Sequence, residues 1–293
     1  MPEGDTVWRT ARRLHEALAG DPLVKADLRW PSLATVDLRG AVTVDVRARG
    51  KHLLHRLDNG LTLHSHLRME GQWGIESTEV LSAHRLSDDA LRAVLSTARW
   101  TALGRRLGML DLVLTTDEGS LVGHLGPDVL GADWDPAVAT ANLAAASTTI
   151  GAALLDQRNL AGVGTIYASE SLFLQGLSPW TPAADLPAQA VGALVERVHR
   201  LLEIGRCGVL PSTTGRARRG ETTFVYGRSG RPCLRCGTTV RVAMIGAAPQ
   251  ARSMFYCPGC QGGLSPTDNG RAAGTLEAAK PATSPIRGRR GSR

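Results

Sequence analysis

Four of the five cysteines lie in two closely spaced pairs. Cys233 and Cys236 form a C-x2-C pair, and Cys257 and Cys260 form a second pair after an interval of 20 residues. This pattern brings four thiolates to the tetrahedral spacing that Zn²⁺ takes. Two disulfides or a redox pair are the alternatives, which a cytosolic protein disfavours. Because four protein ligands close such a site, we expect one structural Zn²⁺ ion; Cys207 is left over, as a small buried thiol.

A glycine-rich turn precedes one of the helical patterns. In "LLDQRNLAGVGTIYASESLF", Gly162 and Gly164 come just before a helix that begins near Thr165. Glycines in this place let backbone N–H groups approach a phosphate, and the helix dipole favours the anion. A lone G-x-G also suits a plain helix–helix corner. Beside a basic zinc module, the turn is a second indication of a nucleic acid ligand.

The positive charge is confined to the C-terminal third of the chain. The net charge is +7, yet residues 1–205 hold 19 Lys/Arg against 24 Asp/Glu. Residues 206–263 hold 9 against 1, and residues 264–293 hold 6 against 2. A basic module of this kind releases counterions from a nucleic acid backbone, although a solvated Arg-rich surface has the same charge.

Lysine is scarce in this chain, which has only Lys25, Lys51 and Lys280 beside 31 arginines. An amine can lose its proton, whereas a guanidinium keeps its proton in proteins. Lys51 in "RGKHLL" is therefore a candidate for chemistry that needs lysine.

The elements that position these residues follow from periodicity. Apolar residues at helical spacing over 5–19 predict an amphipathic helix with Asp5 or Thr6 as N-cap. Residues 22–130 are β-rich: "KHLLHRL" and "LTLHSHL" flank the turn "DNG" and predict a hairpin, and "LDLVLTTDEGSLVGHLG" predicts another. Antiparallel strands with one helix against them indicate a sandwich or flattened barrel.

Helical patterns take over from about Pro136, separated by Pro and Gly. Residues 211–232 then predict a basic loop followed by a short strand, and 233–260 a zinc β-hairpin. The fold class is α+β and multidomain. We place a β-sandwich at 1–130, a helical domain at 131–222, a zinc finger at 223–263 and a disordered basic tail at 264–293.

The bulk composition, 43% hydrophobic and 21% charged, is ordinary for a soluble globular protein. No apolar run approaches the roughly 18 residues of a membrane span. The N-terminus lacks the basic start and apolar core of a signal peptide. We therefore expect a cytosolic protein with no membrane partner.

These motifs occur together, and in this order, in one known family. "MPEGD", "GKHLL", "SHLRMEG", "GPDVL", "LLDQRNLAGVGTIYASE" and the finger ending "FYCPGCQ" resemble the formamidopyrimidine-DNA glycosylase/endonuclease VIII family of bifunctional DNA glycosylases. "PEGD" and the region before the finger are closer to the endonuclease VIII branch. The resemblance implies a β-sandwich with flanking helices, a helix–two-turn–helix DNA-binding domain over "QRNLAGVGTIY" and a zinc finger. Damaged double-stranded DNA would lie in the cleft between the two halves.

The resemblance assigns catalytic roles to Pro2 and Glu3. Removal of Met1 leaves Pro2 with a secondary amine, and an α-amine has a pKa of about 7.7–8.0. The positive end of the following helix lowers that pKa further, so the neutral amine can attack the sugar C1′ and form a Schiff base. Glu3 is implied to protonate the deoxyribose ring oxygen. Without the resemblance, "PEGD" would simply suit the start of a helix.

Two further catalytic residues are carried over from the family. Lys51 is implied to contact phosphate and to donate a proton during β-elimination; the alternative is a solvated strand lysine. Arg252 is implied to grip the phosphate beside the lesion and to promote δ-elimination, because its forked donors match a phosphate.

A base must leave the stack before it is excised, and a side chain then fills the hole. "HLRMEG" matches the void-filling loop, where Met69 is the expected wedge with Arg68 or Glu70 beside it. The alternative is that Met69 belongs to the core.

Two positions depart from the family pattern. Thr165 stands where the family has Asn, and its hydroxyl is expected to cap the helix and keep a weaker phosphate contact. His124 stands where many endonuclease VIII relatives have Arg, so its charge on a phosphate would depend on pH.

The sequence therefore predicts a bifunctional DNA glycosylase and abasic-site lyase of base excision repair, monomeric and associated with the nucleoid. It excises oxidised bases, with pyrimidines expected from the branch, and cuts the strand by β,δ-elimination. A non-catalytic protein that binds damaged or abasic DNA is the alternative. A ribosome-associated or RNA-binding zinc protein would explain the charge but not the N-terminus.

Overall fold

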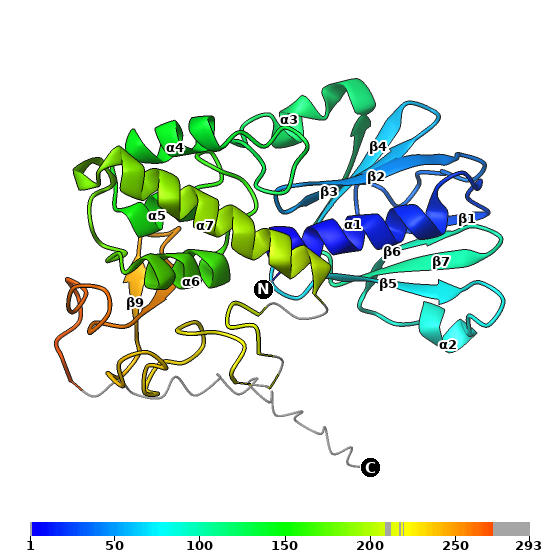
Figure 1. Cartoon of the computed structure of the whole chain (residues 1–293). Helices are drawn as coiled ribbons and strands as arrows, with labels where there is room; N and C mark the ends of the chain where they lie inside the picture. Colours follow the sequence, from blue (N-terminus) through cyan, green and yellow to red (C-terminus); the bar gives the residue numbers. More distant parts are fainter. Residues whose placement is uncertain (1, 209–211, 217, 219, 272–293) are drawn as a thin grey trace, which may run out of the picture.

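The structure is a computed structural model that describes residues 2–208, 212–216, 218 and 220–271. Two four-stranded antiparallel sheets form one half of the molecule (Figure 1). The first sheet has the order β2 (Thr43–Arg49), β3 (His52–Leu57), β4 (Leu61–His66) and β8 (Met109–Leu114). The second has the order β1 (Lys25–Leu28), β6 (Leu91–Ser96), β7 (Trp100–Arg105) and β5 (Gln72–Ser77). Apolar side chains from both sheets share one core, which makes this half the β-sandwich that the sequence predicts.

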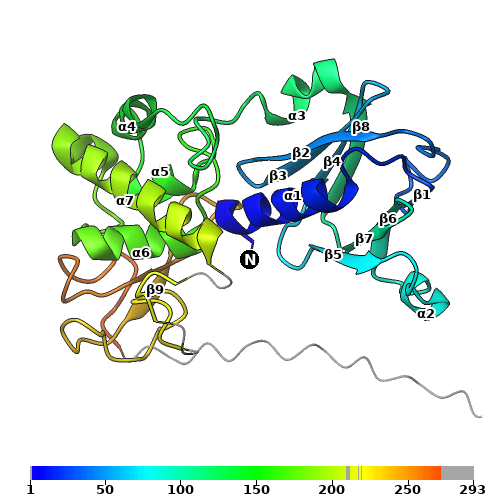
Figure 2. The ribbon, with the colours of Figure 1, turned by 45° about the vertical axis from the view of Figure 1, so that its right-hand side comes forward.

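Helix α1 (Gly4–Leu18) runs along the sandwich and reaches the second half at its N-terminal end (Figures 1 and 2). Its predicted apolar face is buried in the sandwich core. The predicted caps are wrong, because the N-cap residue is Glu3 and Asp5 lies inside the first turn. The Asp5 carboxylate instead accepts a hydrogen bond from Arg9 Nη1 at 3.1 Å, one turn further on.

The hairpin around "DNG" is confirmed as β3 and β4, which pair from His52↔His66 to Arg56↔Thr62. The second predicted hairpin is wrong. β8 pairs with β4 and is followed by the 3-10 turn η1 (Thr115–Asp117) and the short helix α3 (Gly119–Val122). The Glu118 carboxylate accepts hydrogen bonds from Arg56 Nε and Thr62 Oγ1, both at 2.7 Å, and this fixes the turn against the sheet. A short helix, α2 (Ala83–Leu86), also lies inside the β-rich region.

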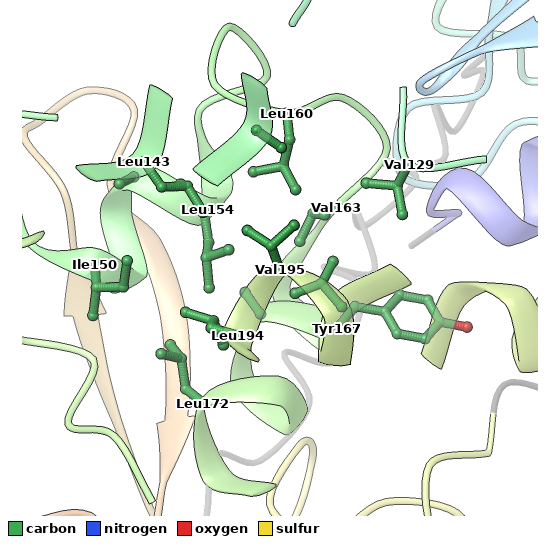
Figure 3. Packing of buried hydrophobic residues seen from close by; sticks show 14 of the residues in the cluster. Val129, Leu143, Ile150, Leu154, Leu160, Val163, Tyr167, Leu172, Leu194 and Val195 are labelled. Atoms are coloured by element: carbon green, nitrogen blue, oxygen red, sulfur yellow. The ribbon is translucent and has the colours of Figure 1, made fainter. Parts of the chain in front are cut away.

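The second half is helical, as expected from about residue 136 onward. Its elements are α4 (Pro136–Ala144), α5 (Ile150–Leu155), α6 (Thr165–Gln175), η2 (Ala183–Asp185) and α7 (Ala188–Cys207). Figure 3 shows their apolar side chains meeting in a second core, to which Leu154, Leu172 and Val195 contribute. Val129 and Leu130 already belong to this second core.

The C-terminal module contains the predicted hairpin, formed by β9 (Arg241–Ile245) and β10 (Arg252–Tyr256). It packs against α6, where Ser169 Oγ accepts a hydrogen bond from the Phe255 N–H at 3.2 Å. The short strand predicted within 211–232 is absent from the described part of that segment. The N–H groups of Phe224, Val225 and Tyr226 instead all donate to the Glu170 carboxylate of α6, each at 2.8 Å.

The sequence predicted a disordered tail from residue 264, which is too early a start. Residues 264–271 are folded against the hairpin, because Asp268 accepts hydrogen bonds from Tyr256 Oη and Arg241 Nη1, both at 2.7 Å. The rest of that tail lies outside the described residues. Among the described helices, none has both the length and the apolar character needed to cross a lipid bilayer.

Candidate active site

The first residues of α1 meet the first residues of α6 at the junction of the two halves. The Gly4 N–H donates to the Gly162 carbonyl at 2.9 Å. The Glu3 carboxylate accepts hydrogen bonds from the N–H groups of Gly164 at 2.8 Å and Ile166 at 2.7 Å, and a longer one from Tyr167 at 3.4 Å. Glu3 therefore caps α6 with its side chain although 161 residues separate it from Gly164.

The glycine-rich turn has a role that the sequence did not reveal. Gly162 has a φ of 102°, and its N–H donates to Gln157 Oε1 at 3.0 Å. The first N–H groups of α6 bind a carboxylate of the same chain, so they are already paired where a phosphate was expected. The capping role expected for Thr165 is wrong, since the N-cap of α6 is Gly164 and Glu3 supplies the cap. DNA contact by these three residues stays a prediction.

Gly164 leaves room for the Glu3 side chain. A Cβ atom added to Gly164 would lie 2.5 Å from Glu3 Cδ and 2.6 Å from Oε1. We expect Gly164→Ala to displace this carboxyl and to slow base excision on the order of a hundredfold, the cost of a misplacement of about 1 Å. Gly192→Ala is the matched control, because a Cβ there meets no atom within 4 Å. Unchanged single-turnover excision by Gly164→Ala would contradict the importance of this packing.

Lys51 lies at the turn between β2 and β3, next to the same segment. Its Nζ donates to the Val163 carbonyl at 2.7 Å, and Gln157 Nε2 donates to that carbonyl at 2.9 Å. The turn is held because the Gly50 N–H donates to Asp128 Oδ2 at 2.8 Å. Lys51 is thus a fixed side chain rather than the solvated strand lysine of the alternative interpretation.

Gln157 and Asp128 hold this arrangement in place and were missed from the sequence. Both occur in the quoted motifs "LLDQRN" and "GPDVL", but nothing local to either motif shows which distant turn it binds.

Burial and charge shift the two ionisable groups of the site in opposite directions. Glu3 is only 1% exposed, and this burial raises the pKa of its carboxyl. The charge of Lys51 and the N–H groups of α6 oppose that rise. Burial lowers the pKa of Lys51; Glu3 opposes that change and Arg252 adds to it. A carboxyl of raised pKa beside an amine of lowered pKa is an arrangement suited to proton transfer.

A cavity of about 820 Å³ opens over these residues. Three segments far apart in the sequence bring Pro2, Lys51 and Arg252 to its lining. Arg68, Met69, Gly164 and Thr165 also line it, whereas Glu3 lies buried beneath the lining. The cavity lies where α1, the sandwich and the hairpin β9–β10 meet.

The loop after β4 carries Met69 into solvent. Met69 is 66% exposed, so the alternative of a core methionine is wrong. The preceding residue, Arg68, has a φ of 52°, and its guanidinium lies 3.3 Å from Met109 Sδ. An exposed thioether on the cavity rim suits a side chain that enters a base stack.

We expect Met69→Ala to slow base excision by roughly 10- to 100-fold. Without the Met69 side chain the emptied place in the base stack stays unfilled, and this unstacking costs about a few kcal/mol. Cleavage of a preformed abasic site should change less, since no base remains to be extruded. Val80→Ala is the control, since Val80 is equally apolar, 76% exposed and outside the cavity lining. Equal losses in both reactions would argue against a wedge.

His124 lies outside the cavity lining and is exposed. Its ring centroid is 6.4 Å from that of His52, which does line the cavity. The phosphate contact expected for His124 stays a prediction.

The four paired cysteines come together at one end of the hairpin. Their sulfur atoms all lie within 4.8 Å of one another, with Cys236 and Cys257 Sγ at 3.4 Å and Cys233 and Cys260 Sγ at 4.0 Å. A disulfide needs about 2.05 Å, whereas four sulfurs around a tetrahedral Zn²⁺ at about 2.3 Å lie close to these separations. The donor set therefore fits a metal ion of the zinc type. Cys207 is exposed, so its expected burial is wrong.

We expect metal analysis to find close to one Zn²⁺ per chain and Cys236→Ser to lose most of it. Structural Zn²⁺ binds with on the order of 10 kcal/mol, so its loss should unfold the hairpin that presents Arg252 and weaken DNA binding. Cys207→Ser is the matched control and should keep its metal. A protein with no zinc and full DNA affinity would contradict this role.

Family models and known relatives agree with this architecture. The model of the formamidopyrimidine-DNA glycosylase N-terminal domain matches residues 1–98, and that of the H2TH domain of the same glycosylase matches residues 125–207. "Probable endonuclease 8 2" of Streptomyces coelicolor is 51% identical over 92% of this chain and 98% of its own length. "DNA-(apurinic or apyrimidinic site) lyase Nei2" of Mycolicibacterium smegmatis is 44% identical over 89% and 99%.

Among solved structures, the formamidopyrimidine-DNA glycosylase of Lactococcus lactis, bound to DNA containing an abasic site, has the same fold. Its TM-score is 0.73 at 23% identity, over 88% of this chain and 99% of that one. The two matching family models and the two relatives place this chain in a class of DNA repair proteins. The chain belongs to the formamidopyrimidine-DNA glycosylase/endonuclease VIII family.

Proposed function

We propose that this protein is a bifunctional DNA glycosylase and abasic-site lyase that acts on damaged double-stranded DNA in base excision repair. The observation that carries the proposal is the convergence of Pro2, Lys51 and Arg252 on one cavity above the buried carboxyl of Glu3. The similarity to an endonuclease 8 and to an abasic-site lyase over almost the whole chain supports it.

Pro2 is the proposed nucleophile. Once Met1 is removed, the lone pair of the Pro2 amine attacks the sugar C1′, and the bond between C1′ and the ring oxygen O4′ breaks with its electrons on O4′. The Pro2 nitrogen then loses its proton to the departing base, the glycosidic bond breaks, and an iminium joins Pro2 to the opened sugar. The start of α1 lies beside Pro2, and its partial positive charge disfavours the ammonium form of the amine.

Glu3 is the proposed proton donor to O4′. The hydrogen bonds from α6 fix its carboxyl next to Pro2, and the raised pKa lets it keep a proton closer to neutral pH.

Loss of the C2′ proton then expels the 3′ phosphate, and loss of the C4′ proton expels the 5′ phosphate. Lys51 is the proposed proton donor in the first elimination and Arg252 the proposed phosphate ligand in the second.

Oxidised pyrimidines are the proposed substrates, because the resemblance to the endonuclease VIII branch implies them. The relatives of highest identity given above, an endonuclease 8 and an abasic-site lyase, support that branch. Formamidopyrimidine-DNA glycosylases are less similar: that of Paracoccus denitrificans is 36% identical. We propose a monomer located with the nucleoid, and a zinc finger whose Zn²⁺ stabilises the hairpin. We also propose domain boundaries near residues 130 and 222, with residues 264–271 belonging to the zinc finger module.

A panel of duplexes, each with a single lesion, tests this function. We expect excision to be fastest for an oxidised pyrimidine, with strand products that end in phosphate on both sides of the gap. Borohydride should trap the protein on the same duplexes and on a preformed abasic site. Tight binding of abasic DNA without excision, cleavage or trapping would favour the alternative of a non-catalytic damage-binding protein.

A further inference from the structure

Three polar side chains form a hydrogen-bonded chain that ends at the cavity. His64 Nδ1 lies 2.9 Å from Asp111 Oδ2, and His64 Nε2 lies 2.8 Å from His52 Nδ1. The strand register places them side by side, because His64 on β4 is paired with Asp111 on β8 and His52 is paired with His66, two residues beyond His64. We call Asp111, His64 and His52 the histidine chain.

The histidine chain runs from solvent through the protein to the cavity. The Asp111 side chain is 42% exposed and that of His64 only 1%. His52 lines the cavity together with His66, and the two rings meet edge to face with their centroids 4.9 Å apart. The mechanism proposed above uses none of these three residues.

The possible hydrogen positions in this chain are few. A carboxylate only accepts, so His64 Nδ1 donates to Asp111. With both rings neutral, His64 Nε2 must accept from His52 Nδ1, and His52 Nε2 is left as an acceptor. One added proton can lie on either ring. If His64 is charged, its Nε2 donates to His52 Nδ1 and the hydrogen of neutral His52 lies on Nε2. If His52 is charged, both of its nitrogens carry hydrogen. In either protonated form, His52 Nε2 becomes a donor.

We infer that the histidine chain is a proton-coupled subsite for a backbone phosphodiester of the bound DNA, with His52 Nε2 as the group that contacts the phosphate. The inference rests on the proposed function, because it takes DNA as the ligand of the cavity. A proton from solvent enters the chain when DNA binds, and the charge it brings lies between the phosphate and the carboxylate of Asp111.

The electrostatic surroundings keep this proton off the free protein. Burial and the facing groups His66, His64, His124 and Arg68 lower the pKa of His52 to about 3. Burial lowers the pKa of His66 to about 4, and the charges of Arg68, His64 and Lys51 contribute to that shift. A phosphodiester anion at hydrogen-bond distance favours the charged form of an imidazole and raises its pKa. One opposite charge changes a pKa by about 1–3. DNA binding should therefore take up a proton at mildly acidic pH, between the free and the bound pKa of the histidine chain.

Calorimetric titration with a duplex that contains a non-cleavable abasic analogue tests the inference. The titrations are run at constant salt and mildly acidic pH in buffers of different ionisation enthalpy, which gives the number of protons taken up. For one linked proton, the association constant falls about tenfold for each unit of rise in pH. We expect this slope and about one proton for the unchanged protein, and a clear loss of both in His52→Gln.

Two more variants separate the histidine chain from its neighbours. Asp111→Asn changes a partly exposed residue, so it guards against a folding defect, and should reduce proton uptake because the compensating charge is gone. His84→Gln changes an exposed histidine of α2 outside the cavity lining and should leave uptake intact. Uptake that survives in His52→Gln, or that disappears only in His66→Gln, would overturn the inference.

Borohydride trapping on abasic DNA is run on the unchanged protein alongside. Trapping with no proton uptake on binding would overturn only the role of the histidine chain. Failure to trap at all would count against the proposed function instead.

Discussion

An N-terminal extension ahead of Pro2 will abolish the covalent chemistry of this protein while DNA binding stays close to normal. A proline inside a chain has an amide nitrogen, which lacks a lone pair free to attack C1′. Loss of a nucleophile costs on the order of 10⁴- to 10⁶-fold in rate, so single-turnover cleavage of an abasic duplex should fall to background. The cavity lining other than Pro2 is unchanged by the extension, so affinity for a non-cleavable abasic analogue should persist.

The control for the extension is the same tag placed after Arg293, which leaves Pro2 unchanged. It should cleave and trap like the untagged protein. If instead the extended protein forms the adduct at the normal rate, the nucleophile is another amine, and Lys51 is the candidate because it also lines the cavity.

Glu3→Gln should slow base excision by roughly 10²- to 10⁴-fold, the usual contribution of a positioned general acid. An amide cannot donate a proton in the way a carboxylic acid does, and its NH₂ would face N–H donors of Gly164, Ile166 and Tyr167. Cleavage of a preformed abasic site should fall less, because the glycosidic bond is already broken. The two reactions are compared in single-turnover assays on matched duplexes.

The pH profile of the unchanged protein gives a second test of Glu3. Its pKa is raised, mainly by burial, so the protonated acid persists above its usual range and is lost as pH rises through the raised value. Excision should therefore decline on the alkaline side of that pKa, and Glu3→Gln should lack this limb. Glu16→Gln, on an exposed part of α1, is the control. Equal rates for Glu3→Gln and the unchanged protein would remove Glu3 from the mechanism.

Local patterns predicted much of this molecule. The hairpin β3–β4 follows from alternation around "DNG", and the four cysteines follow from two C-x2-C pairs. Both depend on residues close together in the sequence or on a ligand set with fixed spacing. The helical half was likewise visible in 3.6-residue periodicity, and its apolar faces meet in one core.

Three features that the sequence did not predict involve contacts between distant segments. The resemblance assigned Glu3 a role as proton donor, but its binding to the start of α6 depends on how the two halves pack. In place of the strand predicted within 211–232, the chain forms a loop whose N–H groups donate to Glu170. In place of the second predicted hairpin, it forms a turn that Glu118 holds against the sheet. In each case a buried carboxylate bound to a distant segment outweighs the local propensity, because it satisfies backbone or side-chain donors that would otherwise lack partners.

The candidate catalytic residues stand in recognisable motifs, whereas the residues that support them do not. The motifs carry Pro2, Lys51 and Arg252, and the cavity brings these three together. Gln157, Asp128 and the histidine chain hold or adjoin them through tertiary contacts that no spacing rule describes.

Mapping the trapped adduct tests the central claim most directly. The unchanged protein is reduced with borohydride on abasic DNA, the DNA is digested, and tryptic peptides are examined by mass spectrometry. We predict that the sugar remnant lies on the peptide from Pro2 to Arg9, attached to the nitrogen of Pro2. A remnant on Lys51, with the N-terminal peptide unmodified, would contradict the account.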